Sequence, residues 1–332
     1  MFDFLKENIN SGLYSAYQYA FLKDGLISCG CGGTLDFDSN EKISDSTQFD
    51  LASLTKAIVT VPVFYELFVS EKLSENEKIF RFFGDFKSDI TISELIRHTS
   101  GFPAWLPFYE LVPAEKSLEE RKKEVEKIIF EHQTADKTKC YSDLNYLLLS
   151  FILERIFQQP LDVIFKDFCS RNGLHSKPTY HPAEKTPKTA FSKLRNDFPE
   201  KTVEDENCWF LGGITGHAGL FGSASEVVSY FNRLLKTSWF LPTAERLNFA
   251  GFDRPEGNDS NYGKSAKSRY FGHLGFTGTA FLIDPETKTI AALLTNSTHP
   301  TPDKPERKER IKRARQEFFD SVFLTAFSRA HI

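Results

Sequence analysis

The sequence predicts an α+β fold: strands from both ends of the chain form one antiparallel sheet, flanked by helices, with a mostly helical region inserted between them. Two strand-like runs near the N-terminus, residues 14–22 and 26–37, are joined by a turn at Lys23-Asp24-Gly25. Near the C-terminus, residues 278–283 and 289–295 flank a turn that begins at Asp284-Pro285. Helical periodicity extends from about residue 53 to residue 170, which favours one sheet built from the two termini.

The other elements follow in chain order. A helix precedes the first hairpin, and helical runs occupy residues 92–96, 118–130 and 146–157. Residues 176–206 are rich in Pro, Lys, Thr and Asp and are expected to form long loops, whereas a charged helix starts near residue 305. We expect residues 1–60 and 207–332 to form an α/β sheet domain and residues 61–206 to form a helical domain. The active site is expected in the cleft between them.

The composition is that of a soluble globular protein, with 40% hydrophobic and 26% charged residues. The net charge of −4 gives no general attraction to nucleic acid or to an anionic membrane. Seven basic residues lie between Lys304 and Arg315, but Glu306 and Glu309 alternate with them. We interpret this run as the solvated face of an amphipathic helix, and expect a small-molecule or peptide substrate as the partner, not nucleic acid or a membrane.

The cysteines indicate reduced thiols rather than disulfides or a metal site. There are five, an odd number, at scattered positions without a C-x-x-C pair: Cys29, Cys31, Cys140, Cys169 and Cys208. The N-terminus carries acidic residues where a signal peptide needs basic ones, and the longest apolar stretch, residues 146–153, is far short of a membrane span of ~20 residues. For a complete chain we therefore expect a cytoplasmic protein without metal or cofactor.

Ser53-Leu54-Thr55-Lys56 is an S-x-x-K tetrad at the start of an apolar helical run. Three residues apart on a helix, the serine and the lysine share a face, and the serine lies at the positive end of the helix dipole. The structural alternative is a capping serine with a lysine whose ammonium reaches solvent. A second tetrad, from Ser39 to Lys42, lies in a polar loop and has no such context.

Two further motifs follow the tetrad in order. Tyr141-Ser142-Asp143 opens an apolar helix, and residues 272–278, GHLGFTG, open the last hairpin. A tetrad, a Tyr- or Ser-centred triplet and a K-T-G-type strand are the signature set of penicilloyl-serine hydrolases. The chain resembles the serine β-lactamase and penicillin-binding-protein-like family, on its class C and esterase side, where Y-x-N replaces S-x-N and H-x-G often replaces K-T-G. Residues 91–101, 205–221 and 294–300 also resemble family segments.

The resemblance implies the β-lactamase/transpeptidase-like fold and specific roles for the motif residues. Ser53 would be the nucleophile that forms an acyl-enzyme, and Lys56 would orient it and shuttle its proton. Tyr141 would be the base for acylation, its phenol made more acidic by the lysine. The backbone N–H groups of Ser53 and Phe276 would form the oxyanion hole, next to Gly275, where a side chain would crowd the substrate.

Two departures from the family pattern concern the charge of the site. His273 replaces the lysine that helps to bind a substrate carboxylate, and Asp143 replaces the asparagine of Y-x-N. With a neutral His273, the charges of Lys56 and Asp143 cancel and leave the site without net charge, and the aspartate should keep Lys56 protonated and shift base work toward Tyr141. Further supporting residues are expected around the cleft: Trp105, Asn207 and His217.

We therefore expect a serine hydrolase that forms an acyl-enzyme at Ser53 and hydrolyses an ester or amide bond of a small, uncharged substrate, as an esterase does. A D-Ala-D-Ala carboxypeptidase, a muropeptide amidase or a weak β-lactamase are alternatives. A non-catalytic binding protein with a retained cleft is the alternative from another class. The G-x-S-x-G, H-E-x-x-H and P-loop motifs are absent from the sequence, so other serine-esterase, metalloprotease and nucleotide chemistries lack support.

Overall fold

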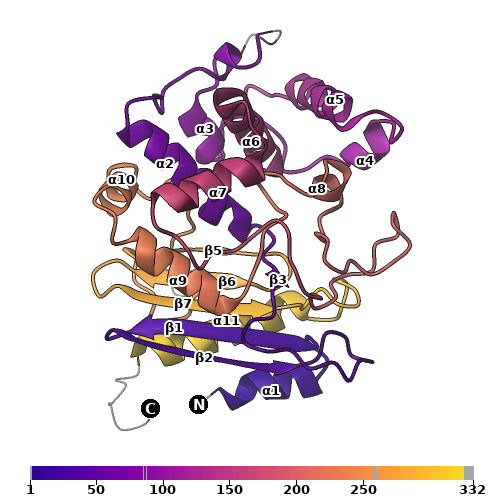
Figure 1. Ribbon diagram of the computed structural model, residues 1–332, viewed down its shortest axis with the longest axis vertical. Coiled ribbons are helices and arrows are strands. Elements are labelled where there is room, and N and C mark those ends of the chain that lie inside the picture. The colour runs from indigo at the N-terminus through magenta and orange to yellow at the C-terminus, as the bar shows by residue number, and fades with distance from the viewer. Residues whose placement is uncertain (1, 85, 87, 258–259, 325–332) are drawn as a thin grey trace.

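The two ends of the chain meet in one antiparallel sheet. The structure is a computed structural model that describes residues 2–84, 86, 88–257 and 260–324. Five strands pair in the order β2-β1-β7-β6-β5 (Figure 1). Their bounds are β1 Ala16–Lys23, β2 Leu26–Gly33, β5 Phe271–Leu274, β6 Ala280–Asp284 and β7 Thr289–Thr295. Because Tyr17 of β1 lies opposite Thr295 of β7, the N-terminal and C-terminal hairpins are neighbours, and the predicted sheet is confirmed.

Helices cover both faces of this sheet. Helix α9 (Ala224–Leu234) packs against β1 and β7 on one face, while α1 (Asp3–Asn10) and α11 (Arg307–Leu324) lie on the other (Figure 1). Successive residues of β7 point to opposite faces: Ala291 and Leu293 pack with α11, and Ala292 packs with the α9 side. Every residue of β7 is buried, as expected for a strand that is covered on both faces.

The remaining helices form a separate layer beyond the α9 face of the sheet (Figure 1). They are α2 Val61–Val69, α3 Ile92–Ile96, α4 Phe108–Leu111, α5 Leu118–Glu131, α6 Asp143–Phe157, α7 Leu161–Arg171, α8 Glu206–Phe210 and α10 Phe240–Arg246. The helical middle of the chain is thereby confirmed. Within the described residues, 172–205 contain no helix or named strand, in agreement with the predicted loops. The domain boundaries at residues 60 and 206 stay a prediction.

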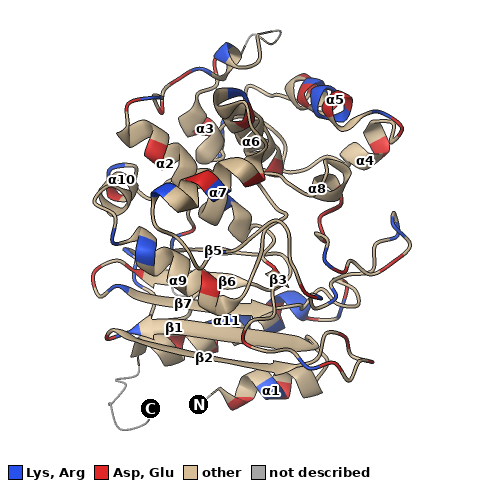
Figure 2. Cartoon of the chain, in the orientation of Figure 1, with Lys and Arg blue, Asp and Glu red and all other residues tan. Residues whose placement is uncertain are grey.

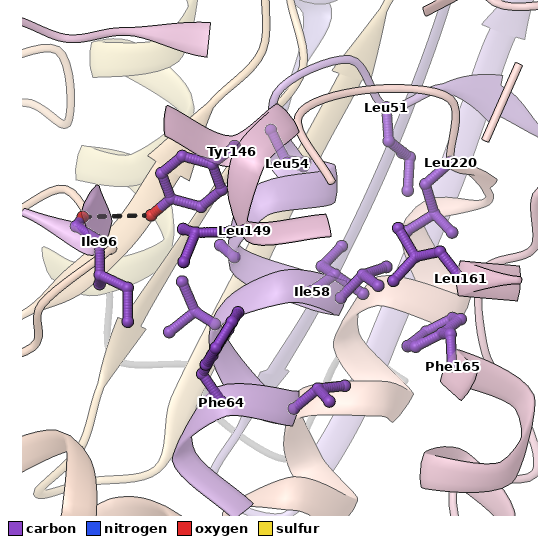
Figure 3. Close-up of a cluster of buried hydrophobic side chains, with 14 of the residues drawn as sticks. Leu51, Leu54, Ile58, Phe64, Ile96, Tyr146, Leu149, Leu161, Phe165 and Leu220 are labelled. Atoms are coloured by element: carbon purple, nitrogen blue, oxygen red, sulfur yellow. Dashed lines mark hydrogen bonds between the residues drawn. The ribbon is translucent and has the colours of Figure 1, made fainter. Parts of the chain in front are cut away.

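The helix that follows Ser53 runs through the middle of the core. Leu54 and Ile58 pack among side chains of α6 and α7, such as Leu149 and Phe165 (Figure 3). A wide π-helical turn, Lys56–Thr60, leads into α2, whose second residue is Pro62. Since proline has no N–H for the carbonyl four residues earlier, that carbonyl of Ile58 instead accepts a hydrogen bond from the Tyr230 hydroxyl (2.6 Å). Ser53 thus directly precedes a buried, well-packed helix.

Charged residues are dense on outer helices such as α5, and the central strands are largely uncharged (Figure 2). The basic run near the C-terminus forms α11 as predicted, but its side chains are not all solvated. Arg307 is 5% exposed and Arg315 is 6% exposed, because both point toward the sheet rather than away from it. The interpretation of the whole run as a solvated face is therefore wrong for these two residues. In the described part of the chain, no helix has the length and apolar character needed to cross a bilayer.

A glycine at the junction of α2 and α6 permits a close approach of the chain. Gly251 has φ of +84°, and a Cβ there would lie 2.4 Å from Val61 Cγ2. Gly12 has a similar φ of +73° but no atom within 4 Å of such a Cβ.

We predict that Gly12→Ala lowers the free energy of unfolding by about 1–2 kcal/mol, from backbone strain alone. Gly251→Ala should add an overpacking cost of about 1–3 kcal/mol to that strain. Urea unfolding of both variants measures the difference, and equal losses would contradict it.

Candidate active site

Ser53 is held at the end of a tight turn by the carboxylate of Asp50. One oxygen of Asp50 accepts the N–H of Ala52 (2.8 Å), and the other accepts the N–H of Glu204 (2.7 Å). Ala52 has a φ of +48°, which side chains seldom tolerate, so the turn depends on this support. A short two-stranded sheet, β3 Phe49–Asp50 with β4 Phe221–Gly222, fixes the segment just before the turn. Ser53 therefore lies in a loop that these contacts hold in place, directly before a helix.

Lys56 is fully buried and makes three contacts through its ammonium group. Nζ donates to Ser53 Oγ (2.8 Å) and to the carbonyl of His217 (3.2 Å), and lies 2.7 Å from Asp143 Oδ1. Of the three N–H donors of the ammonium, two are used by Ser53 and the His217 carbonyl, and the contact with Asp143 is an ion pair. Burial is the largest influence and lowers the pKa of Lys56, but the charges and hydrogen bonds of Asp143 and Tyr141 together outweigh it and raise the pKa above its usual value. Lys56 is thus an ammonium at neutral pH, as expected from the sequence.

Tyr141 lies against this ammonium, with Lys56 Nζ 4.9 Å from its ring centroid. Although the residue is 44% exposed, burial of its phenol raises the pKa of Tyr141, and the positive charge of Lys56 lowers it. The nearby carboxylate of Asp143 also raises this pKa, and the net effect is upward. Lys56 therefore acts on the phenol in the expected direction, but the expectation of a more acidic phenol is wrong, because burial and the charge of Asp143 together raise the pKa by more.

The Tyr141 ring is supported by His98, a residue that lies in the segment 91–101 and was not among the expected site residues. The ring of His98 lies 4.6 Å from that of Tyr141, and its Nδ1 accepts the N–H of Ser142 (3.0 Å). Burial, and to a smaller extent the charge of Lys56, lower the pKa of His98 to about 3, so the ring is neutral with its proton on Nε2. Its φ of +60° is the local signal that this residue is held in place by its surroundings.

The two N–H groups that are expected to form the oxyanion hole make no hydrogen bond within the described part of the protein. Within the described residues, neither the N–H of Ser53 nor that of Phe276 donates a hydrogen bond to another protein group, and both residues line the same cavity. Gly275 is required for a different reason than expected. A Cβ there would meet Thr279 Oγ1 at 2.0 Å and the Leu51 carbonyl at 2.8 Å, so it would push apart the protein's own segments rather than the substrate.

His273 is buried in the cavity wall next to Tyr141. It is 3% exposed, and its Nδ1 lies 2.8 Å from the Leu274 carbonyl, so Nδ1 donates and Nε2 is left as an acceptor. Burial lowers the pKa of His273, with a smaller upward effect from Asp253. The structure therefore places a neutral imidazole where related enzymes have a cationic lysine, in agreement with the sequence analysis.

The cavity in front of Ser53 has a volume of about 1210 Å³ and is lined by more acidic than basic side chains. Trp105, 46% exposed, and Phe191 supply apolar surface. Lys193 is the one lysine or arginine among the described lining residues, against eight carboxylates: Asp50, Glu110, Asp143, Glu204, Asp205, Glu206, Asp253 and Asp303. Burial raises the pKa of Asp50 to about 6 and that of Glu204 to about 7. With eight acidic side chains and one basic side chain, the wall is more acidic than the neutral pocket expected from the motifs.

The last two predicted residues have supporting positions. His217 is 2% exposed and lies between Asp205 (Nε2 to Oδ1, 3.1 Å) and Thr215 (Nδ1 to Oγ1, 2.9 Å), with its carbonyl on Lys56. Asn207 is buried behind the segment that follows Trp105. Its side chain accepts the N–H of Phe108 (2.9 Å) and donates to the Leu106 carbonyl (2.8 Å), and it is not among the described lining residues.

The comparisons with known proteins agree with this geometry. A family model described as Beta-lactamase matches residues 14–316. An N-acetylmuramyl-L-alanine amidase of Bacillus subtilis (strain 168) is 30% identical over 348 residues, covering 87% of this chain and 79% of that protein. A putative D-alanyl-D-alanine carboxypeptidase of Escherichia coli (strain K12) is 26% identical over 317 residues, covering 80% of this chain and 73% of that protein.

A solved structure has the same fold. It is described as EstCE1, a hydrolase with promiscuous acyltransferase activity, and it superposes with a TM-score of 0.69 at 16% identity. The match covers 94% of this chain and 96% of that one. The fold and family expected from the motifs are confirmed. Because the family match extends over most of the chain, and a relative at 30% identity covers it almost as fully, the chain belongs to the beta-lactamase family of serine hydrolases.

Proposed function

We propose that this enzyme cleaves an ester or amide bond of a small substrate through an acyl-enzyme on Ser53, with Lys56 and Tyr141 as the other catalytic residues. The observation that carries the proposal is the contact of a fully buried ammonium with the Ser53 hydroxyl, 2.8 Å from Nζ to Oγ, beside two free backbone N–H groups. A binding protein would have no use for a buried ammonium there, which is costly to keep. The intact pair therefore favours catalysis over the non-catalytic alternative.

The state of Lys56 indicates how the proton moves. As an ammonium, Lys56 donates to Ser53 Oγ and stabilises the developing alkoxide, but it has no lone pair with which to accept the hydroxyl proton. Tyr141 accepts the proton of Ser53 while its own phenolic proton passes to the leaving oxygen or nitrogen. The new Ser53 Oγ–acyl bond forms, and the N–H groups of Ser53 and Phe276 hold the oxyanion. Hydrolysis of the acyl-enzyme repeats these transfers in reverse, with water as the attacking group.

The charge of the cavity supports an uncharged or cationic acyl group. Carboxylates predominate in the lining, and the neutral ring of His273 offers no positive charge to a substrate carboxylate. A peptide amide remains the second candidate substrate, because the 30% identical relative is an N-acetylmuramyl-L-alanine amidase.

We also propose that the site lies between an α/β sheet unit, residues 1–60 and 207–332, and a helical unit, residues 61–206. In support, Ser53 and His273 of the first unit share the cavity with Tyr141 of the second.

Covalent labelling tests the nucleophile. A fluorophosphonate should add one adduct to the protein, on the tryptic peptide that contains Ser53, as measured by mass spectrometry. Ser53→Ala should abolish this adduct, because no other hydroxyl has an ammonium at 2.8 Å and free N–H groups beside it in the described structure. The second tetrad provides a matched control, since Ser39→Ala should label like the wild-type protein. Labelling that survives in Ser53→Ala would overturn the proposal.

A turnover panel tests the substrate class. It comprises short-chain p-nitrophenyl esters, a chromogenic cephalosporin, a D-Ala-D-Ala peptide and a muramyl peptide. We expect kcat/KM for the best neutral ester or amide to exceed that for the cephalosporin by at least about a hundredfold, because the carboxylate of the cephalosporin meets an acidic cavity. Comparable turnover of the cephalosporin would contradict an uncharged or cationic acyl group. It would leave Ser53 acylation intact.

Replacement of Asp143 tests its control over Lys56. Asp143→Asn removes the charge that raises the pKa of Lys56, and burial then acts to lower that pKa. In the wild-type enzyme the ammonium persists up to and beyond the usual lysine pKa, so Lys56 should add no titration to kcat/KM between pH 6 and pH 9 (roughly the range below a free lysine). In Asp143→Asn a limb that rises with pH should appear in that range, because the neutral amine can act as a base.

The same variant should also accept anions better. At pH 6 it carries one more positive charge, and a unit charge ~6–8 Å from a carboxylate contributes about 1–2 kcal/mol at an effective dielectric constant of ~20–40. The ratio of kcat/KM for cephalosporin to that for ester should therefore rise roughly tenfold. Asp303→Asn is the control, since Asp303 lines the cavity and has no ion pair with Lys56. Identical pH profiles for Asp143→Asn and the wild-type enzyme would show that Asp143 does not set the protonation of Lys56.

A further inference from the structure

Helix α11 carries two buried arginines that lack a carboxylate partner. Arg307 and Arg315 are 5% and 6% exposed, and in the described part of the chain no carboxylate lies within ion-pair distance of either guanidinium. Burial lowers the pKa of Arg315 to about 10, which leaves it charged at neutral pH. A buried charge without a counter-charge is costly, so its retention requires a compensating contact.

Both arginines donate to backbone carbonyls of the turn that carries the second oxyanion donor. Arg315 Nη2 donates to the carbonyls of Gly275 (3.0 Å) and Thr279 (3.2 Å). Arg307 donates through Nη2 to the carbonyl of Phe276, and through Nε to that of Ser297 (3.0 Å). The two guanidinium groups thus hold successive peptide units, Gly275–Phe276 and Phe276–Thr277.

The first of these peptide units contains the N–H that faces the cavity. In a trans peptide, the C=O and the N–H of one unit point in opposite directions. Since the Gly275 carbonyl points to Arg315 on the α11 side, the Phe276 N–H of the same unit points away from α11. Phe276 lines the cavity, and its N–H has no protein partner in the described structure. The contact with Arg315 therefore fixes the direction of the free N–H.

The charge of Arg315 also acts through this peptide unit. A hydrogen bond at the carbonyl polarises the amide and strengthens the hydrogen bond that its N–H can donate. The turn itself supplies one such bond, from the Gly278 N–H to the Gly275 carbonyl (3.1 Å), but that donor is neutral. A guanidinium is a charged donor and contributes about twice the strength of a neutral one.

We propose that Arg315 is a positioning residue for catalysis, which orients and polarises the Phe276 N–H toward the oxyanion through the Gly275 carbonyl. The inference rests on the proposed acyl-enzyme function at Ser53. It assigns to a helix at the far end of the chain a role in stabilising the transition state, although Arg315 does not touch the substrate.

The test compares Arg315→Met with the wild-type enzyme on an ester and on a boronic acid. Phenylboronic acid forms a tetrahedral adduct on an active-site serine and places an oxygen in the oxyanion hole, so its Ki reports on the hole. Complete loss of an oxyanion donor lowers kcat by about 10²–10³-fold, and here the donor remains but is less well held. We expect kcat to fall roughly tenfold to a hundredfold, KM to change less than about twofold, and the Ki of the boronic acid to rise in parallel with the loss of kcat/KM.

Other arginines of α11 provide the controls. Arg310→Met removes a guanidinium that bonds Ser11 at the surface, and should leave kcat and Ki unchanged. Arg307→Met removes an equally buried arginine from the next peptide unit, whose N–H belongs to Thr277, so it matches Arg315→Met in lost packing. Its Ki should change less than about threefold. Arg315→Lys keeps a charged donor and should recover part of kcat even if Arg315→Met folds poorly.

The outcomes separate this inference from the proposed function. If the wild-type enzyme neither hydrolyses esters nor binds the boronic acid at Ser53, the proposed function fails. If the wild-type enzyme does both and a folded Arg315→Met retains kcat and Ki within about twofold, the role of Arg315 is overturned. An equal loss in Arg307→Met and Arg315→Met would overturn it as well, since it would indicate a general effect of removing a buried arginine.

Discussion

The ammonium of Lys56 is the group on which the rest of the site depends. A fully buried lysine costs several kcal/mol unless each donor has a partner, and the three partners come from three separate segments. Ser53 belongs to the same turn of helix, Asp143 begins α6, and the His217 carbonyl belongs to the loop before β4. Burying this one charge therefore requires the three segments to converge, and their convergence is the active site.

Two threonine side chains set the spacing between the backbone N–H groups that we propose as oxyanion donors. Thr277 Oγ1 donates to the Asp50 carbonyl (2.9 Å), and Thr279 Oγ1 donates to the Leu51 carbonyl (3.2 Å). These two bonds join the strand turn that carries Phe276 to the loop that carries Ser53. With Gly275 allowing the close approach, the two N–H groups lie on a rigid frame, as preorganised stabilisation of an oxyanion requires.

In the proposed function, the charge of the substrate is selected by residues around Ser53 and Phe276 rather than by these two residues themselves. The Lys56–Asp143 pair is neutral as a unit, and His273 is kept neutral by burial, so the cationic field that would attract a carboxylate is absent from these positions. The carboxylates of the cavity wall add an opposing field. In the proposed function, a few ionisable side chains around Ser53 therefore select the charge of the substrate.

The sequence by itself determined the pairing of strands from both termini, and its motifs singled out Ser53, Lys56 and Tyr141, which the fold brings together, since these follow from local periodicity and from motifs in a fixed order. Only the tertiary structure decided the raised pKa of Tyr141 and the support from His98, because these depend on burial and on neighbours distant in sequence. The burial of Arg307 and Arg315 was likewise not predicted, because a run of basic residues on a helix does not by itself indicate which of them face the sheet. Local pattern determines which side chains carry the chemistry, whereas packing between distant segments sets their charge and orientation.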